Sequence, residues 1–243
     1  MDIKIFENAE QIACAAAQLY KELVGSKPNA VLGLATGATP VPTYKKLIEL
    51  YNNGEISFKD VTTFNLDEYC DLDKNDKNSY YTFMHENLFN HVDIKEENVN
   101  FLDGNAKDYD AESKRYAEAI KAAGGIDLQL LGIGTNGHIA FNEPADKFTD
   151  EAFRVTLTQS TINSNQKYFG DVPMPRYAMT MGIGSIMRSK KILLIATGES
   201  KAKAIKAMVS GEITPQIPCS ILNEHKSVII MLDICRRTLY LVV

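Results

Sequence analysis

Residues 30–51 read AVLGLATGATPVPTYKKLIELY, and they contain the unit that repeats along this chain. The first six residues form a continuous apolar run, which is typical of a strand buried on both faces of a sheet. The TGATP loop comes next, and Pro40 stands where a helix can begin, because the first turn of a helix leaves its N–H groups without partners. The sequence therefore predicts a strand, a short polar loop and a helix that continues toward Tyr51.

The alternation of apolar strands with helical patterns continues toward both ends of the chain. Buried strands that alternate with helices indicate an α/β fold: an open, mostly parallel sheet with helices on both faces, Rossmann-like in layout. We expect one domain over residues 1–243, with its ligand beyond the carboxyl ends of the strands. The remaining strands are expected at residues 3–6, 61–66, 99–102, 128–133, 153–157, 177–181, 191–197, 227–232 and, as a short edge, 239–243; helices at 8–24, 79–89, 110–123 and 200–210; and a polar loop at 67–79.

Composition argues against several classes of protein. The 243 residues are 45% hydrophobic and 23% charged, and their formal net charge is −5. An acidic chain lacks the basic surface that nucleic-acid binding requires, and no apolar run approaches the roughly 18 residues that span a membrane. The first residues lack a secretory signal pattern, and the four cysteines show no CxxC pair or metal-site spacing. We expect a cytoplasmic protein with reduced thiols, no metal site, and no nucleic-acid or membrane partner.

A pair of carboxylates follows one of the predicted strands. The stretch FNLDEYCDL, residues 64–72, places Asp67 and Glu68 at the strand's end. Neighbouring side chains on an extended chain point to opposite sides, so one of the two is expected to face a pocket. A carboxylate at a dry strand end can act as a general base. Taken alone, this motif is equally well interpreted as a solvated loop carboxylate.

The motif GTNGHIAFNEP, residues 134–144, follows another predicted strand. Asn136 and His138 lie two residues apart, so an extended loop would place them on the same side. Glu143 can return to His138 if the loop bends, and the two glycines of the motif allow that bend. An imidazole between an amide and a carboxylate is an oriented acid or base. The alternative is a structural histidine beside an Asn-Gly turn, but three polar side chains after a buried strand favour function.

Two further loops could bind an anion. The first consists of Thr36, Gly37, Ala38 and Thr39, and it stands before a helix, where free backbone N–H groups and small residues suit a phosphate. The second contains Lys201, which is expected in the first turn of the last helix, where a cation opposes the helix dipole and an anionic partner would explain it. Taken singly, the better interpretations are an ordinary strand-to-helix turn and a solvated surface lysine.

The combination of LATGATP, FNLDEY, GIGTNGHIAFNEP and GESKAKA closely resembles the glucosamine-6-phosphate deaminase family, over nearly the whole chain and in the same order. FNxDEY together with GHIAFNEP is highly specific, whereas TGAT and GESKA are weaker alone. The resemblance implies an enzyme that converts glucosamine 6-phosphate and water to fructose 6-phosphate and ammonia. It also implies a Rossmann-like sheet, no organic cofactor, and a small-molecule sugar phosphate as the partner.

The resemblance further implies a role for each catalytic residue. Asp67 would be the base that moves a proton from the carbon bearing nitrogen to the neighbouring carbonyl carbon. His138 would open the sugar ring, and Glu143 would hold His138 and tune its charge. Asn136 occupies a position where many members carry Asp; it can hydrogen-bond the imidazole but brings no charge.

The same resemblance places the substrate phosphate on the loop from Thr36 to Thr39, with Lys201 supplying charge. Ala38 stands where many members have a glycine, a small change if its backbone φ stays negative. Lys167 stands where many members have an arginine, and it lacks the two-pronged guanidinium, so weaker phosphate binding is expected.

Two other functions compete with this interpretation. A 6-phosphogluconolactonase resembles the same fold and grips a sugar phosphate, but it has no need of a proton-shuttling Asp67. A non-catalytic sugar-phosphate sensor could lose Asp67 or His138, and both are present. Members activated by N-acetylglucosamine 6-phosphate have basic residues after FNEP and a longer tail; this chain reads AFRVTLT there and stops at Val243, so no such activation is expected. Whether the chain is a monomer or a homo-oligomer stays open.

Overall fold

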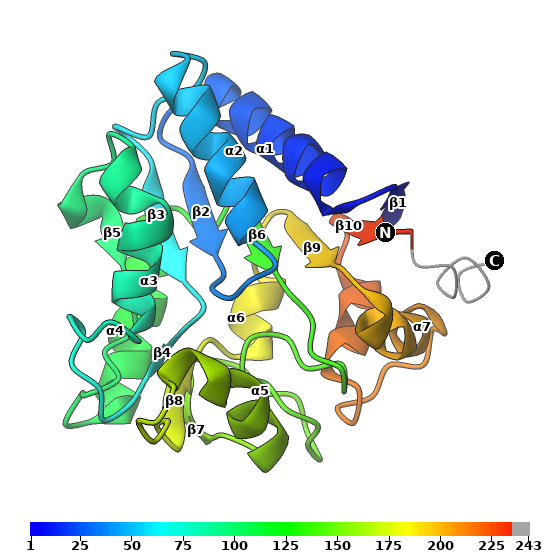
Figure 1. The fold of residues 1–243 in the computed structure, drawn as a ribbon. Helices are drawn as coiled ribbons and strands as arrows, with labels where there is room; N and C mark the ends of the chain where they lie inside the picture. The colour runs from blue at the N-terminus through cyan, green and yellow to red at the C-terminus, as the bar shows by residue number, and fades with distance from the viewer. Residues whose placement is uncertain (235–243) are drawn as a thin grey trace.

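The main sheet of the protein has seven strands in the order β1-β10-β9-β6-β2-β3-β5, and every neighbouring pair is parallel. The computed structural model describes residues 1–234, and the edge strand predicted at residues 239–243 lies outside them. The predicted open parallel sheet is confirmed (Figure 1). Its strands are β1 (Asp2–Phe6), β2 (Val31–Leu34), β3 (Thr62–Asn65), β5 (Val99–Asn100), β6 (Leu128–Leu131), β9 (Ile192–Ala196) and β10 (Val228–Asp233).

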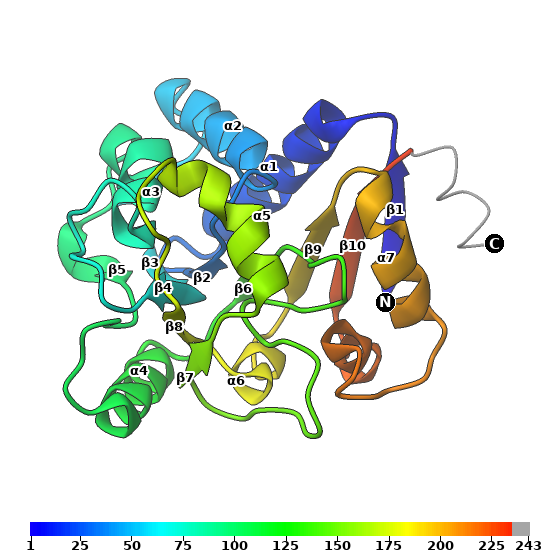
Figure 2. The same cartoon turned by 60° about the horizontal axis from the view of Figure 1, so that its bottom comes forward.

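Helices cover both faces of this sheet (Figure 2). On one face lie α1 (Ala9–Ser26) and α2 (Val41–Asn52), which pack against each other, and on the other lie α4 (Tyr109–Ala122) and α6 (Ile183–Met187). Because both faces are covered, β2, β6 and β9 are buried along their whole length. This burial explains why those strands are almost entirely apolar in the sequence, with the buried Gln129 of β6 as the exception. The helices α3 (Tyr80–Asn87) and α7 (Ala202–Val209) also match predicted helices.

A second, antiparallel sheet was not predicted. Its strands are β4 (Asp67–Tyr69), β8 (Tyr177–Thr180) and β7 (Phe153–Thr156), in the order β4-β8-β7. Strand β4 lies in the segment that the sequence predicts to be a polar loop, and the prediction is wrong for these three residues, all of which are buried. Pairing with β8, far along the chain, makes this polar segment a strand, and local polarity cannot reveal such a partner.

One helix beside the small sheet was also not predicted. Helix α5 (Gln159–Phe169) reads QSTINSNQKYF, which is rich in residues of modest helix propensity. Thr158 caps its start by accepting a hydrogen bond from the N–H of Thr161. A small apolar cluster joins α5 to the second sheet and includes Tyr69, Phe141, Leu157, Phe169, Met174 and Ala178. Tertiary packing therefore forms this helix where intrinsic propensity does not.

Candidate active site

Polar motifs of the sequence meet at the carboxyl ends of β2, β3 and β6, in the middle of the main sheet. A cleft of about 180 Å³ opens there. Loops after all three strands line it, as expected for an open parallel sheet. The structure brings together six of the residues predicted from sequence, namely Thr36, Gly37, Ala38, Thr39, Asp67 and His138.

The loop after β2, residues 36–39, lines this cleft. Gly37 has a φ of +98°, and no atom lies near the position of an added Cβ, so the backbone angle is what requires glycine. Ala38 is not among the residues of positive φ, so alanine fits this position without strain. Helix α2 begins with Pro40 as its cap and has no side-chain cap hydrogen bond. Pro40 and Pro42 have no backbone N–H, so the donors that remain for an anion at this helix start are the N–H groups of Val41 and Thr43.

Asp67 lies on β4 at the side of the cleft. The residue is only 6% exposed, and within residues 1–234 its carboxyl has no hydrogen-bond or ion-pair partner. Burial, together with the neighbouring charge of Glu68, raises the pKa of Asp67 to about 8. A carboxyl group with this pKa exchanges a proton readily near neutral pH, which is what a general base needs.

Glu68 points away from Asp67 and bonds to the backbone. Its Oε1 accepts hydrogen bonds from the N–H of Tyr69 (2.8 Å) and of Tyr80 (2.9 Å), and its Oε2 accepts one from the N–H of Tyr81 (2.8 Å). The two carboxylates thus face opposite sides, as the extended chain predicts. Glu68 ties β4 to the start of α3, whose first residue, Tyr80, lines the cleft.

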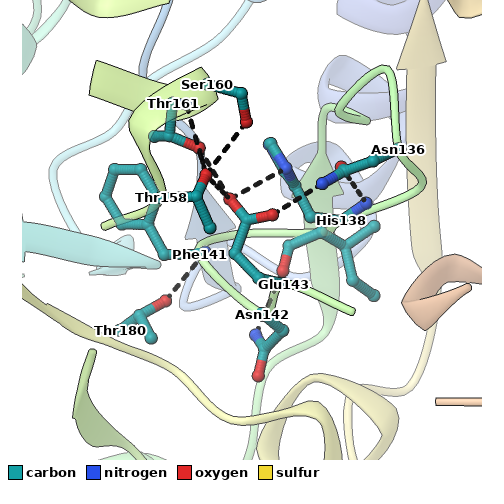
Figure 3. Close-up of polar contacts among 10 residues, drawn as sticks. Asn136, His138, Phe141, Asn142, Glu143, Thr158, Ser160, Thr161 and Thr180 are labelled. Atoms are coloured by element: carbon teal, nitrogen blue, oxygen red, sulfur yellow. Dashed lines mark hydrogen bonds and ion pairs between the residues drawn. The ribbon is translucent and has the colours of Figure 1, made fainter. Parts of the chain in front are cut away.

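His138, Glu143 and Asn136 form a network beyond β6 (Figure 3). Oε1 of Glu143 lies 3.3 Å from Nδ1 of His138, close enough for an ion pair although the two are not aligned as a regular hydrogen bond. Oε2 of Glu143 accepts a hydrogen bond from Asn136 Nδ2 (2.6 Å), and Oε1 accepts one from Thr161 Oγ1 (2.6 Å). Burial alone would raise the pKa of Glu143, but His138, Thr161 and Asn136 together outweigh burial and lower it to about 2.

Asn136 contacts the imidazole indirectly. The sequence predicts a bond between its amide and the imidazole, whereas in the structure the amide nitrogen donates to Glu143 and Oδ1 accepts from the backbone N–H of His138 at 3.2 Å. The cause is Gly137, whose φ of +86° bends the loop, so the two side chains do not lie on one extended face. Asn136 therefore holds Glu143, and Glu143 in turn lies against His138.

Gly134 makes room for the imidazole. A Cβ at this position would lie 2.3 Å from the ring of His138, so no other residue fits without moving the histidine. The N–H of Gly134 also donates to the carbonyl oxygen of His138 at 2.8 Å, which closes the loop. The glycine freedom predicted from the sequence thus has two separate causes, a close approach at Gly134 and a positive φ at Gly137.

The two predicted phosphate lysines do not line the cleft in this structure. Lys201 ends a short 3-10 helix, η3 (Glu199–Lys201), after β9, next to β6 and at the same edge of the sheet as the cleft. Burial lowers the pKa of Lys201. Lys167 is exposed on α5, with its Nζ 5.0 Å from the ring centre of Tyr168. The residue of α5 that lines the cleft is Asn165.

Three residues of the site were missed by sequence reasoning. Tyr80 and Asn165 line the cleft, and Thr161 bonds to Glu143. A threonine cap before residues 159–169 was the available signal for α5, and with α5 predicted, Thr161 and Asn165 would have become candidates. Tyr80 had no such signal, because it depends on the long-range bond from Glu68.

A larger cavity lies elsewhere and has a different character. It measures about 510 Å³ and lies between the end of α4 and α6, near the amino ends of β6 and β9. Its most prominent charge, Arg188, is already paired with Asp150 and Glu151. Among residues 1–234, no group of three or more His, Cys, Asp or Glu could hold a metal ion, at either cavity or elsewhere. The acid–base groups are therefore concentrated at the strand-end cleft.

Comparisons with known proteins find relatives over nearly the whole chain. Residues 6–231 match the family model of glucosamine-6-phosphate isomerases/6-phosphogluconolactonase. The chain is 53% identical to a glucosamine-6-phosphate deaminase of Mycoplasma mycoides over 234 residues, which cover 96% of this chain and 95% of that protein. It is 49% identical to a glucosamine-6-phosphate deaminase of Thermoanaerobacter over 96% of this chain and 92% of the relative.

Solved structures show the same relationship. A monomeric glucosamine-6-phosphate deaminase superposes with a TM-score of 0.94 at 41% identity, over 99% of this chain and 100% of that one. The 6-phosphogluconolactonase of Thermotoga maritima shares the fold, with a TM-score of 0.77 over 96% of this chain and 99% of that one, at only 18% identity. The chain therefore belongs to the family of glucosamine-6-phosphate isomerases/6-phosphogluconolactonase.

Proposed function

We propose that this chain converts D-glucosamine 6-phosphate and water to D-fructose 6-phosphate and ammonia. One observation carries the proposal: a buried carboxyl group with a pKa of about 8 and an imidazole paired with an ionised carboxylate line one cleft with an anion-binding loop. An amino-sugar phosphate needs these three elements, because its ring must open, a proton must move between two carbons, and its phosphate must be held.

Ring opening is the step that we assign to His138. The imidazole takes the proton of the anomeric hydroxyl and gives a proton to the ring oxygen, so the pyranose becomes an open-chain aldehyde. Glu143 is ionised, with its pKa near 2, and its oxygen lies 3.3 Å from Nδ1 of His138. It therefore stabilises the protonated imidazole between the two transfers.

Isomerisation and deamination follow at Asp67. Its carboxylate takes the proton from the carbon that bears nitrogen, while the aldehyde oxygen gains a proton and the ammonium group loses one, which gives an enolamine. The protonated Asp67 then gives its proton to the former aldehyde carbon. The resulting ketose imine adds water and releases ammonia. Asp67 must be deprotonated to begin, and the positive charge of the substrate amine favours its carboxylate form. Burial of Asp67 keeps bulk water from the reactive intermediate.

Phosphate binding is assigned to the loop from Thr36 to Thr39 and the start of α2. Small residues, a positive φ at Gly37 and an uncapped helix start supply N–H donors there. Lys201 follows a strand next to β6, and its partial burial, which lowers its pKa, suits a cation that gains an anionic partner. Lys167 lies on the exposed surface of α5, the helix whose Asn165 lines the cleft, and we assign it a weaker contribution of charge.

A cytoplasmic location is part of the same proposal. Cys14, Cys70 and Cys219 are free thiols, and Cys14 is exposed, which suits a reducing compartment. In the part of the chain that the structure describes, no helix is long and apolar enough to span a bilayer. The substrate class, a charged sugar phosphate, is also one that cells retain inside their membrane.

The decisive test compares two reactions of the purified protein. Ammonia release from glucosamine 6-phosphate, measured with a coupled dehydrogenase, is expected to be fast, and fructose 6-phosphate should appear in equal amount. Glucosamine without phosphate should react far more slowly, because binding energy from the phosphate orients the reacting carbons. Two results together would overturn the proposal in favour of a lactonase: hydrolysis of 6-phosphogluconolactone, and no release of ammonia from glucosamine 6-phosphate.

A further inference from the structure

Glu68 is a buried carboxylate that the proposed reaction does not use. The residue is 5% exposed, and its two oxygens accept three backbone N–H bonds, all between 2.8 and 2.9 Å. Every partner is a donor, so a proton on Glu68 would displace one of these bonds. Burial raises the pKa of Glu68, and the three backbone donors oppose that rise by favouring its anionic form.

The neighbouring carboxyl group has the opposite surroundings. Asp67 has no hydrogen-bond donor among residues 1–234, and four titratable groups face it from the packed elements: Glu68 and Tyr69 on β4, Tyr80 on α3 and Tyr116 on α4. Burial raises the pKa of all three tyrosines above their usual range, so they are neutral. His138 lines the other side of the same cleft. Glu68 is thus the anion within the wall that carries Asp67.

We propose that Glu68 is a positioning residue for the proton transfer at Asp67. Its bonds fix β4 to the first turn of α3, so that Asp67 and Tyr80 stand on one wall of the cleft. Its negative charge, held beside Asp67, makes Asp67 a stronger proton acceptor than burial alone would. The two neighbouring carboxyl groups thus have different roles: Glu68 carries the negative charge, and Asp67 accepts and returns the proton.

Tyr80, whose N–H bonds to Glu68, also contacts other residues that line or border the cleft. Its hydroxyl donates to the hydroxyl of Tyr69 at 2.9 Å, and its side chain lines the cleft together with Thr36 of the anion-binding loop. Loss of the bond from Glu68 to the N–H of Tyr80 would therefore disturb both the base and the phosphate loop. A role in positioning should change both kcat and KM, whereas the charge itself should change the pH profile.

The proposal rests on the proposed function, and variants separate the two effects of Glu68. Glu68→Gln removes the charge but keeps a carbonyl oxygen for the N–H groups of Tyr69 and Tyr80. Glu68→Asp keeps the charge but is too short to make all three bonds. Glu112→Gln is a matched control, because Glu112 is 6% exposed and also accepts a backbone N–H, from Asp103 at 2.7 Å, but does not face Asp67.

The pH profile of kcat/KM is the first measurement. In Glu68→Gln the limb that rises with pH should move to lower pH by on the order of one unit, the usual scale for a neighbouring charge, and its plateau should fall. Glu68→Asp should lose rate without moving the limb, and Glu112→Gln should leave the limb in place. An unmoved limb in a folded Glu68→Gln protein would overturn the proposal.

Linkage gives a second measurement that needs no catalysis. The difference in thermal stability between the protein and its Asp67→Asn variant should grow with pH until the pH reaches the pKa of Asp67. In the Glu68→Gln background, the pH at which this difference stops growing should be lower. Failure of the deaminase assay would leave this shift intact, so the two proposals are distinguishable. If Glu68→Gln does not fold, carboxyl ¹³C titration of the unmodified chain decides, and a Glu68 that titrates at higher pH than Asp67 overturns the inference.

Discussion

Asp67 on β4 and Glu143 in the loop after β6 are the two carboxyl groups of the candidate active site, and their protonation is opposite. Both are buried to a similar degree, with Asp67 6% exposed and the side chain of Glu143 11% exposed. The pKa of Asp67 is raised to about 8, whereas that of Glu143 is lowered to about 2. Burial alone therefore does not decide the charge of these two carboxyl groups; the donors around Glu143, which Asp67 lacks, make the difference.

The donors come from different parts of the fold. Glu143 receives hydrogen bonds from Asn136 on its own loop and from Thr161 on α5, and it lies beside His138. Asp67 lies on the short strand β4 and receives no such bond. The N–H groups of Tyr80 and Tyr81, at the start of α3, bond to Glu68 instead. One carboxyl group is thus a fixed charge that orients an imidazole, and the other is a proton carrier.

Removal of the proton carrier should have the largest effect. Asp67→Asn keeps the shape of the side chain but cannot accept a proton, so kcat for ammonia release should fall by about 10³-fold or more, within the range for loss of a general base. Substrate affinity, measured by calorimetry, should change little, because the anion-binding loop is untouched. The exposed Asp73, in the loop that follows β4, offers the control Asp73→Asn, which should retain full activity. Comparable losses in both variants would show that the effect is not specific to position 67.

Removal of the fixed charge should have a smaller effect. Glu143→Gln keeps one acceptor oxygen but places an amide N–H₂ against a donor, Asn136 or Thr161, and no longer stabilises a protonated His138. We expect kcat to fall by about 10- to 100-fold, as for loss of a group that orients a reacting residue. Glu151→Gln is the matched control, because Glu151 is an ion-paired carboxylate outside the cleft. A loss in Glu143→Gln as deep as that in Asp67→Asn would mean that the two carboxyl groups do not divide the work.

The sequence predicted the positions of these residues better than their charges. Asp67, His138 and Glu143 stand in motifs directly after strands of the main sheet, and for parallel strands the chain order places such motifs at one edge. Strand β4 and helix α5 escaped prediction because both depend on partners distant in sequence: β4 pairs with β8, and α5 packs through Phe169 onto Tyr69. The donors of Glu143 and the absence of donors at Asp67 follow from those partners, so the charges could not be predicted from sequence.

The same comparison predicts a pH dependence of stability. The pKa of Asp67 is higher in the folded chain than the usual value near 3.9, so between about pH 4 and pH 8 the folded chain holds a proton that the unfolded chain has lost. The contribution of Asp67 to stability therefore falls as pH rises through this window. Asp67→Asn lacks this penalty and should gain, relative to the unmodified protein, up to a few kcal/mol at about pH 8. Denaturant unfolding at pH 5 and pH 8 measures the difference, and an advantage that shrinks with pH would contradict the raised pKa.

The smallest effect should come from a single donor of Glu143. Thr161→Val removes the 2.6 Å bond from Oγ1 to Glu143 Oε1 and leaves a side chain of similar shape at a buried position. Thr158 lies 3.3 Å from the same oxygen and can strengthen its own bond, so the carboxylate keeps two donors besides the imidazole. We expect kcat to fall only a few-fold, which corresponds to about 1 kcal/mol for one hydrogen bond to a charged group partly replaced by another. Thr156→Val, on the exposed face of β7, is the control. Since α5 reaches the site through Thr161, a loss as large as that of Glu143→Gln would show that this one bond, rather than the set of donors, fixes the charge beside His138.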